Sequence, residues 1–461
     1  MTGFDIRDRR NEIGLSQSKL ADLTGIGQAR ISAYELGKFD LNLNEIKKIA
    51  NHLEIIDDTT VQALKKKRYQ NSNYLESIIN QRQRKSYKKT KRNQEYLEVL
   101  KTLENNFLNP AKTELKVASF FAGCGGLCYG IKAAGFDIVA TNELIDAYKE
   151  IYKLNFPNAN FLPNDVREIT NRDIDNTIKK YGVIDLMVGG PPCQGFSLAG
   201  KRDVNDKRNT LFAYYLKIAE KMKPKVILVE NVRLLTSMKD SNGSLVSKRI
   251  LDTFESIGYK SVFFNVNAKD YGVPQHRERV IFIAVRKDLK NIPTIANTKY
   301  GNSNNLFNSI KPFFSFGDGV SDLEYLESGE KSKTDKHHWA VKHPEHVIRW
   351  LVDVPEGKSA HDNEDAILRP PSGYNTTYKR QVWSEPAGTV ATTYGMISGC
   401  RNVHPIATRA LTNREALRLQ SFPDSFKLTG NYGTIRTVIG NAVPPLLGYE
   451  LAKYIRDTYM L

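Results

Sequence analysis

Short helical patterns of apolar residues fill the chain from about residue 4 to residue 56. Ile6, Arg10 and Ile13 share one helical face, and Ser16 is placed as the cap of a second helix. Apolar residues at helical spacing then mark a further amphipathic helix, namely Leu43, Ile46, Ile49, Ala50 and Leu53. The pattern therefore predicts a small all-α domain at residues 1–57.

From residue 115 onward the pattern changes to short, continuous apolar runs separated by helical ones. Such runs are typical of buried parallel strands. They occupy residues 115–121, 137–141, 183–188, 224–232 and 276–284. The alternation of strand and helix predicts an α/β sheet, and sheets of this kind bind their ligands at the carboxyl ends of the strands.

The stretch between these two regions, residues 58–112, carries several runs of basic residues. We expect a linker or an exposed basic helix, which is either simply solvated or in contact with phosphates. The whole chain has 461 residues and a formal charge of +16, which favours a polyanionic partner such as nucleic acid.

Composition also bears on the cellular location of the protein and on metal binding. No apolar run reaches the length of a membrane helix, and the first residues do not form a secretion signal, so a cytoplasmic location is expected. The four cysteines lack the spacing of a disulfide framework or of a zinc site, and we expect no bound metal.

A glycine-rich turn follows the first predicted strand at residues 122–126, and a helix follows the turn. This succession opens a nucleotide-binding α/β sheet. The dinucleotide fingerprint would need a glycine where Cys128 stands, so a nicotinamide cofactor is disfavoured. Glu143 follows the second strand at a place suited to ribose hydroxyls, and Asp165 comes later at a place suited to an adenine amino group. Their succession after the glycine turn favours a cofactor site over two ordinary surface acids.

Cys193 stands just after two prolines at the end of the third predicted strand. A lone cysteine is more often a small buried apolar residue than a nucleophile. Two later features favour chemistry. Glu230 lies at the end of the fourth strand, where a carboxylate is costly to bury without a partner. Arg277 and Arg279 alternate with Glu278, which predicts that both guanidinium groups point to one face.

The N-terminal region resembles the Cro/repressor-type helix-turn-helix domain, and residues 15–17 and 31–38 carry the resemblance. In that domain the second helix of the motif lies in the DNA major groove. The resemblance implies that Gln17 approaches a phosphate and that Gln28, Arg30 and Ser32 face base edges.

The chain from about residue 115 to its end is similar to the DNA (cytosine-5)-methyltransferase family. Six short motifs occur in the family's order, which is far more specific than any one of them. They are Phe121-x-Gly-x-Gly-Gly126, Pro191-Pro-Cys-Gln194, Glu230-Asn-Val232, Gln275-x-Arg-x-Arg279, Arg414-Glu-Ala-x-Arg-Leu-Gln-Ser-Phe-Pro423 and Gly440-Asn-Ala-Val-Pro444. The similarity implies a Rossmann-like catalytic domain at residues 113–290, to which residues 408–461 return. It also implies a smaller target-recognition region at residues 291–407.

The same similarity implies catalytic roles. Cys193 would add as a thiolate to C6 of cytosine, and Glu230 would hold and protonate ring N3. Arg279, with Arg277 nearby, would hold O2 of the base and orient Glu230. The base would first have to leave the duplex.

S-adenosylmethionine is the implied methyl donor. Phe121 would stack on its adenine, Glu143 would bind its ribose and Asp165 its adenine amino group. Ser119 stands where some family members have an acid, which leaves the contact to the methionine amino group open. The other implied pocket residues are Gly123, Gly125, Gly126, Val166, Pro192, Leu211, Asn441 and Val443.

The predicted function is therefore methylation of cytosine C5 in a specific duplex sequence, as the modification enzyme of a restriction–modification system. The helix-turn-helix domain would repress transcription at an operator near its own gene, which it would occupy as a homodimer. Alternatively, this domain adds affinity for substrate DNA. Two further interpretations are a transcription factor with an inactive enzyme-like domain and a tRNA methyltransferase. The tRNA branch carries a Cys-Phe-Thr tripeptide that this chain lacks.

Overall fold

The computed structural model describes residues 3–53, 87, 89–192, 209–239, 243–301, 310–363, 368–399 and 401–460. Contacts divide the chain into two compact units. The first holds Met1–Tyr87, Leu323–Val382 and Tyr394–Thr412, and the second holds Lys88–Asp322, Trp383–Thr393 and Asn413–Leu461. The second unit thus includes residues 291–322 and 383–393, which the sequence assigns to the target-recognition region. The domain limits drawn from the sequence stay a prediction.

Four helices begin the first unit: α1 (Gly3–Glu12), α2 (Gln17–Thr24), α3 (Gln28–Glu35) and α4 (Leu43–His52). Their apolar faces meet in one core that includes Ile6, Leu20 and Ile31, all fully buried. Ser16 caps α2 as predicted, because its side chain accepts the N–H of Lys19. Ile13 departs from the prediction and is 45% exposed, since α1 ends one residue before it.

Six strands form the central sheet of the second unit, in the order β2-β1-β3-β4-β6-β5. Neighbouring strands from β2 to β4 pair in parallel, whereas β6 runs antiparallel between β4 and β5. All the predicted apolar runs form strands. The strands are β1 (Lys116–Phe120), β2 (Asp137–Thr141), β3 (Leu186–Gly189), β4 (Val226–Val232), β5 (Tyr259–Asn267) and β6 (Glu278–Arg286). The edge strand β5 was not predicted because polar residues interrupt its apolar pattern.

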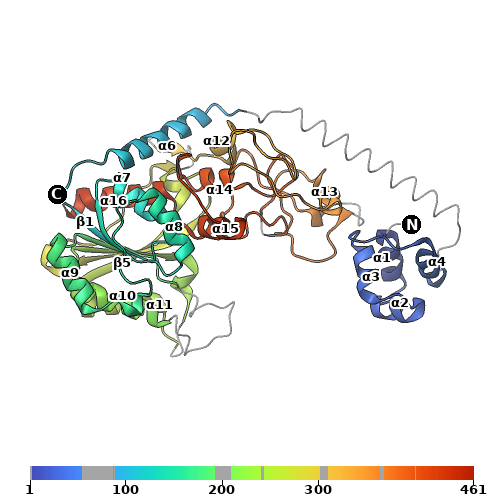
Figure 1. Ribbon diagram of the computed structural model, residues 1–461, viewed down its shortest axis with the longest axis horizontal. Coiled ribbons are helices and arrows are strands. Elements are labelled where there is room, and N and C mark those ends of the chain that lie inside the picture. Colours follow the sequence, from blue (N-terminus) through green and yellow to red (C-terminus); the bar gives the residue numbers. More distant parts are fainter. Residues whose placement is uncertain are drawn as a thin grey trace. The chain divides into compact units, whose positions relative to one another are not determined.

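Helices cover both faces of this sheet (Figure 1). One face carries α9 (Asn171–Tyr181), α10 (Asn209–Met222) and α11 (Val246–Ser256). The other carries α6 (Asn93–Leu108), α7 (Gly126–Ala133) and α16 (Pro445–Tyr459), and α16, which belongs to the returning residues 408–461, packs along α7. The helix α8 (Asp146–Asn155) follows β2.

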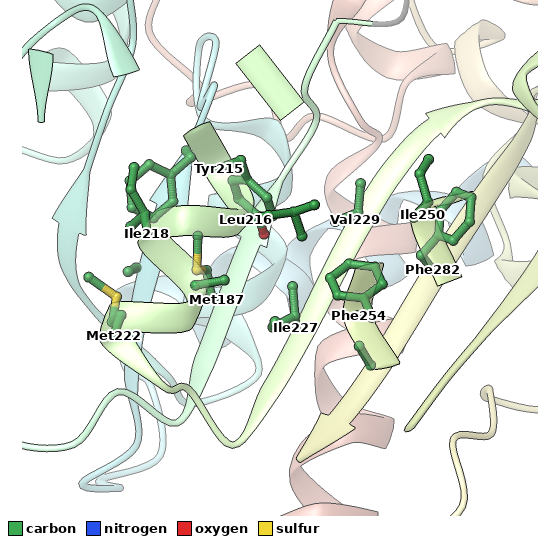
Figure 2. Packing of buried hydrophobic residues seen from close by; sticks show 14 of the residues in the cluster. Met187, Tyr215, Leu216, Ile218, Met222, Ile227, Val229, Ile250, Phe254 and Phe282 are labelled. Atoms are coloured by element: carbon green, nitrogen blue, oxygen red, sulfur yellow. The ribbon is translucent and has the colours of Figure 1, made fainter. Parts of the chain in front are cut away.

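The core between the sheet and α10 and α11 is continuous (Figure 2). Tyr215 and Met222 of α10 lie over Met187 and Ile227 of the sheet, and Phe254 of α11 lies beside them. Each of these side chains is almost fully buried. Truncating a buried aromatic residue such as Phe254 typically costs about 3–5 kcal/mol, so this layer fixes the strands whose ends carry the candidate residues.

Shorter elements complete the described chain. The second unit also holds the pair β7 (Tyr300–Gly301) and β8 (Lys311–Pro312), and the first unit holds α13 (Glu345–Leu351). The second unit also contains α12 (Phe316–Val320), α14 (Asn413–Leu419) and α15 (Tyr432–Asn441). The helices α14 and α15 lie in its last segment, Asn413–Leu461, and α12 packs against α14. Among the residues that the structure describes, no helix is long and apolar enough to cross a membrane.

Candidate active site

The parallel strands place most of the candidate residues at one edge of the sheet. Phe121 follows β1, Glu143 follows β2 and Pro192 follows β3, whereas Glu230 lies near the end of β4. Because parallel strands end at the same edge, these residues come together although they are far apart in the sequence. They line one cavity of about 330 Å³, together with Arg277 and Arg279.

Glu230 and Arg279 form an ion pair inside this cavity. Arg279 Nε lies 2.6 Å from Glu230 Oε1, and each side chain is 12% exposed. The pair arises from the sheet register: Arg279 lies opposite Val232, which places it diagonally across from Glu230 on the same face. The cavity thus holds a carboxylate and a forked donor side by side, as required to hold a planar heterocycle by its polar edge.

Arg277 is placed differently from Arg279, although both line the cavity. It is almost fully buried, and its Nη1 and Nη2 donate to the carbonyls of Val390 and Gly440 at 3.1 and 3.0 Å. Burial lowers the pKa of Arg277, and the charge of Arg279 acts in the same direction. Arg277 therefore joins two returning segments at the cavity wall, whereas Arg279 is the arginine paired with Glu230.

Cys193 and the rest of residues 193–208 lie outside the described residues. Pro191 and Pro192, which precede Cys193, line the cavity. The buried Asn231 donates from Nδ2 to the carbonyl oxygen of Pro191 at 2.8 Å. Asn231 thus ties the turn after β3 to β4. In the sequence Asn231 is marked only as part of the Glu230-Asn-Val232 motif, and no spacing signal reveals its contact to Pro191.

Two other cysteines are described, and both are buried. Cys124 lines the cavity, and burial raises the pKa of its thiol to about 12. Burial also raises the pKa of Cys128, whose thiol donates to Ser119 Oγ at 3.1 Å. A thiol acts as a nucleophile through its thiolate, so neither cysteine is suited to attack near neutral pH.

The glycine turn lines the other side of the cavity. Phe121 has a φ of 55°, which is rare for an aromatic residue, and Gly123 has a φ of 58°. Such conformations concentrate at functional sites. A Cβ atom at Gly126 would lie 2.4 Å from the carbonyl oxygen of Val443, so the start of α7 can meet the 440–443 segment only through glycine. Asn441 and Val443 of that segment line the same cavity.

Glu143 holds the glycine turn from the end of β2. It is almost fully buried, and its carboxylate accepts the N–H groups of Gly123 and Ile145 at 2.8 and 2.9 Å. Burial raises the pKa of Glu143, and the two amide donors oppose that shift. Tyr148 lines the cavity beside it and was not found from the sequence; its position in the first turn of the helix after Glu143 was the available signal.

The structure does not bring every predicted cofactor residue to this cavity. Gly125 caps α7 with a φ of 90°, and Leu211 packs against the core of the sheet. Asp165 caps a short 3-10 helix that contains Val166, and it accepts Arg167 Nε at 2.9 Å, which lowers the pKa of Asp165. None of these four residues is among those that line the cavity, and their cofactor roles stay predictions.

The predicted DNA-reading residues of the helical bundle also have protein partners. Gln17 donates to Glu35 Oε2 at 2.7 Å, and Arg30 lies 2.6 Å from Glu45 Oε1. Gln28 is exposed and Ser32 is half-buried, both on α3, while Ile31 is buried in the core of the bundle. Their contacts to DNA stay predictions.

A mostly parallel sheet with helices on both faces and a cavity at the strand ends defines a Rossmann-like α/β fold. Solved structures share it. An E. coli prophage protein described as a DNA modification methyltransferase matches with a TM-score of 0.57 at 23% identity, over 74% of this chain and 99% of that one. The Entamoeba histolytica methyltransferase EhMeth matches with a TM-score of 0.51 at 17% identity, over 75% of this chain and 99% of that one.

The sequence comparisons are more specific. The chain belongs to the C-5 cytosine-specific DNA methylase family, whose model matches residues 115–457, and a helix-turn-helix model matches residues 6–57. The Type II methyltransferase M1.HphI of Haemophilus parahaemolyticus is 34% identical over 350 residues, covering 74% of this chain and 86% of the relative. M.Sau96I of Staphylococcus aureus is 30% identical over 455 residues, covering 98% of this chain and 96% of the relative. The predicted family, fold class and enzyme class are confirmed.

Proposed function

We propose that this enzyme transfers a methyl group to C5 of a flipped-out cytosine in a specific duplex DNA sequence, as the modification enzyme of a restriction–modification system. The observation that carries the proposal is the ion pair of Glu230 and Arg279 in the cavity at the strand ends. The relatives named as Type II methyltransferases support the biological setting.

The residues of the cavity fit S-adenosylmethionine as the methyl donor. Gly123 leaves open space where a side chain would stand, Phe121 offers an aromatic ring, and Glu143 offers a carboxylate suited to ribose hydroxyls. When bound, this cofactor supplies an electrophilic methyl group on a sulfonium. In our proposal Pro192, Asn441 and Val443 complete its contacts.

The chain's own residues would activate the base. The thiolate of Cys193 adds to C6, and a new S–C6 bond forms. Glu230, as the acid, gives a proton to N3, which draws the ring electrons and stabilises the enamine; Arg279 holds O2 and keeps Glu230 in place. After C5 has taken the methyl group, loss of its proton to a base breaks the S–C6 bond and frees Cys193.

A direct test measures transfer of labelled methyl groups from S-adenosylmethionine to duplex DNA and to tRNA in competition. We expect incorporation into DNA alone, and loss of it in Cys193→Ser. Preferred labelling of tRNA would favour the RNA branch of the family, and methyl transfer by Cys193→Ser would refute the nucleophile. Bisulfite sequencing of DNA from an expressing host would give the recognition sequence.

We further propose that the helix-turn-helix domain binds an operator near its own gene as a homodimer and represses transcription. The exposed face of α3, which carries Gln28 and Arg30, supports this role. Footprinting of the upstream region should reveal a protected site that lacks the methylation target. Protection of methylation targets alone would contradict it. In the rival case, deletion of residues 1–86 would weaken methylation itself.

A further inference from the structure

The helix α6 precedes the part of the chain that the methylase family model matches, yet it packs against the sheet unit. The model begins at residue 115, whereas α6 covers Asn93–Leu108. One face of α6 is buried, through Tyr96, Leu100, Leu103 and Phe107. The helix lies along α7, as Figure 1 shows. The sequence predicted a linker or an exposed basic helix here, and the buried face corrects that expectation for α6.

The first end of α6 is fixed by specific polar contacts. Asn93 Nδ2 donates to the carbonyl of Asp318 and to the carboxylate of Asp322, both at 2.9 Å. The hydroxyl of Tyr96 donates to the carbonyl oxygen of Arg418 at 2.5 Å. Arg418 lies in the Arg414–Pro423 motif, by which the sequence resembles the family, so α6 is attached to one of the motif segments that return to the sheet unit.

The last turn of α6 contributes an aromatic side chain to the sheet unit. Phe107 stacks on Tyr129 of α7, with the ring centroids 3.8 Å apart and the planes at 6°. It also meets the ring of Phe156 edge-on, with the centroids 5.4 Å apart. Lys132 Nζ lies 4.3 Å from the centroid of the Phe107 ring. Aromatic contacts of this geometry stabilise beyond the area they bury.

Phe156, which meets the ring of Phe107, also lies against the glycine turn. A Cβ atom at Gly125 would lie 2.6 Å from Phe156 Cε2 and 3.0 Å from Tyr152 Cδ2, so these two rings pack directly against the turn at Gly125. Gly125 caps α7, and the next two residues, Gly126 and Leu127, line the cavity. A shift of Phe156 would therefore be transmitted to the cavity wall through one glycine.

We propose that α6 is a supporting element of the cofactor pocket and that Phe107 is a positioning residue, which acts on the glycine turn through Phe156 and Tyr129. This inference rests on the proposed binding of S-adenosylmethionine in the cavity. The catalytic unit of this protein then begins at about residue 89, upstream of the family's motifs. Removal of the N-terminal bundle is tolerated for cofactor binding only if α6 is kept.

The test compares Phe107→Ala with the control Leu108→Ala in the full chain. Leu108 is the next residue of the same helix and is 63% exposed. We measure the Kd for S-adenosylmethionine and for S-adenosylhomocysteine by equilibrium dialysis, and then KM and kcat. In Phe107→Ala both Kd values and the cofactor KM should rise about three- to tenfold, whereas kcat at saturating cofactor should change less than about twofold. In Phe107→Tyr, which keeps the ring, both Kd values and the cofactor KM should stay near those of the unmodified enzyme.

Several outcomes would overturn the inference. Equal Kd values in Phe107→Ala and Leu108→Ala would do so, as would a fall in kcat with an unchanged KM. If Phe107→Ala does not fold, Phe107→Leu keeps most of the volume without the stacked ring, and its Kd decides the matter in the same way. Failure of the unmodified enzyme to bind S-adenosylmethionine would instead count against the proposed function, so the two failures are distinguishable.

Discussion

Two ion pairs between an arginine and a glutamate have nearly the same geometry and opposite surroundings. In the helical bundle, Arg10 Nε lies 2.7 Å from Glu35 Oε1, and the two side chains are 10% and 1% exposed. In the sheet unit, Arg279 lies 2.6 Å from Glu230, and each side chain is 12% exposed. Distance and burial alone do not tell these pairs apart.

The remaining hydrogen-bonding capacity does distinguish them. Glu35 also accepts from Arg10 Nη2 at 2.9 Å and from Gln17, and Arg10 also donates to the carbonyl of Leu15 at 2.7 Å. That network is closed within the bundle. Glu230 and Arg279 instead line a cavity, where the unused polar atoms of the pair can meet a ligand. A closed pair contributes to folding, and an open pair is available for chemistry.

The largest effect is expected when the open pair is neutralised. Glu230→Gln keeps the shape but cannot give up a proton as an acid, so methyl transfer should fall about 10²- to 10⁴-fold. Thermal unfolding should change little, because water in the cavity can solvate Arg279. Labelled methyl incorporation and calorimetry on the same preparation check both. A loss of stability without a loss of activity would remove the distinction between the pairs.

The matched change in the closed pair is Glu35→Gln. It leaves Arg10 buried without its counter-charge, and breaking a buried pair in this way costs about 3–5 kcal/mol. We expect early unfolding of the helical bundle and loss of operator binding, while methyl transfer to duplex DNA stays within about twofold. Denaturant unfolding monitored by circular dichroism measures the first effect. An unchanged transition would mean that the bundle does not depend on its closed pair.

The open pair and the strands that carry it could largely be predicted from the sequence. Periodicity and the ends of the apolar runs were sufficient for the strands of the parallel sheet, because these strands are buried on both faces. Motif order then led to Glu230 and Arg279, which the structure joins. Arg277 lines the same cavity as Arg279, but its terminal nitrogens are taken up by two carbonyls from distant segments. No local pattern encodes such contacts, and the same is true of Asn231 and of the packing of Phe107.

Edge and surface positions were harder to predict for a different physical reason. The strand β5 has one neighbour and a mixed burial pattern, so alternation of apolar residues is weak there. Gln17 donates to Glu35, which lies 18 residues away and beyond any helical spacing, while its contact to a phosphate stays a prediction. Pairs of this kind follow from tertiary packing and cannot be read from one segment.

A buried histidine in the first unit predicts that stability depends on pH. His343 is buried, its Nε2 accepts the N–H of Ala410 at 3.1 Å, and burial together with the charge of Arg409 lowers its pKa to about 4. In the unfolded chain the same imidazole has a pKa near 6.5. The stability that neutral His343 contributes is therefore fully present above pH 6.5 and is lost as the pH drops toward 4. The loss reaches up to about 3 kcal/mol. Unfolding of the full chain between pH 7.5 and 4.5 measures it.

His343→Gln is the control for that dependence. Its side-chain oxygen can accept the N–H of Ala410 without titrating, so the variant should show a flatter decline of stability with falling pH. An equally steep decline in both proteins would assign the pH dependence to other groups.

The smallest effect tests how the open site is held together. Asn231→Ala removes the bond from Nδ2 to the carbonyl of Pro191, which typically contributes about 1 kcal/mol. Because Pro191 lies two residues before Cys193, we expect a fall in kcat/KM of about fivefold, a larger effect than the small shift in melting temperature would suggest. In Asn231→Asp, which lacks the donor but keeps the size, kcat/KM should fall by a similar factor. If Asn231→Asp retained full kcat/KM, the bond to Pro191 would not position the turn, and the open site would depend on the ion pair alone.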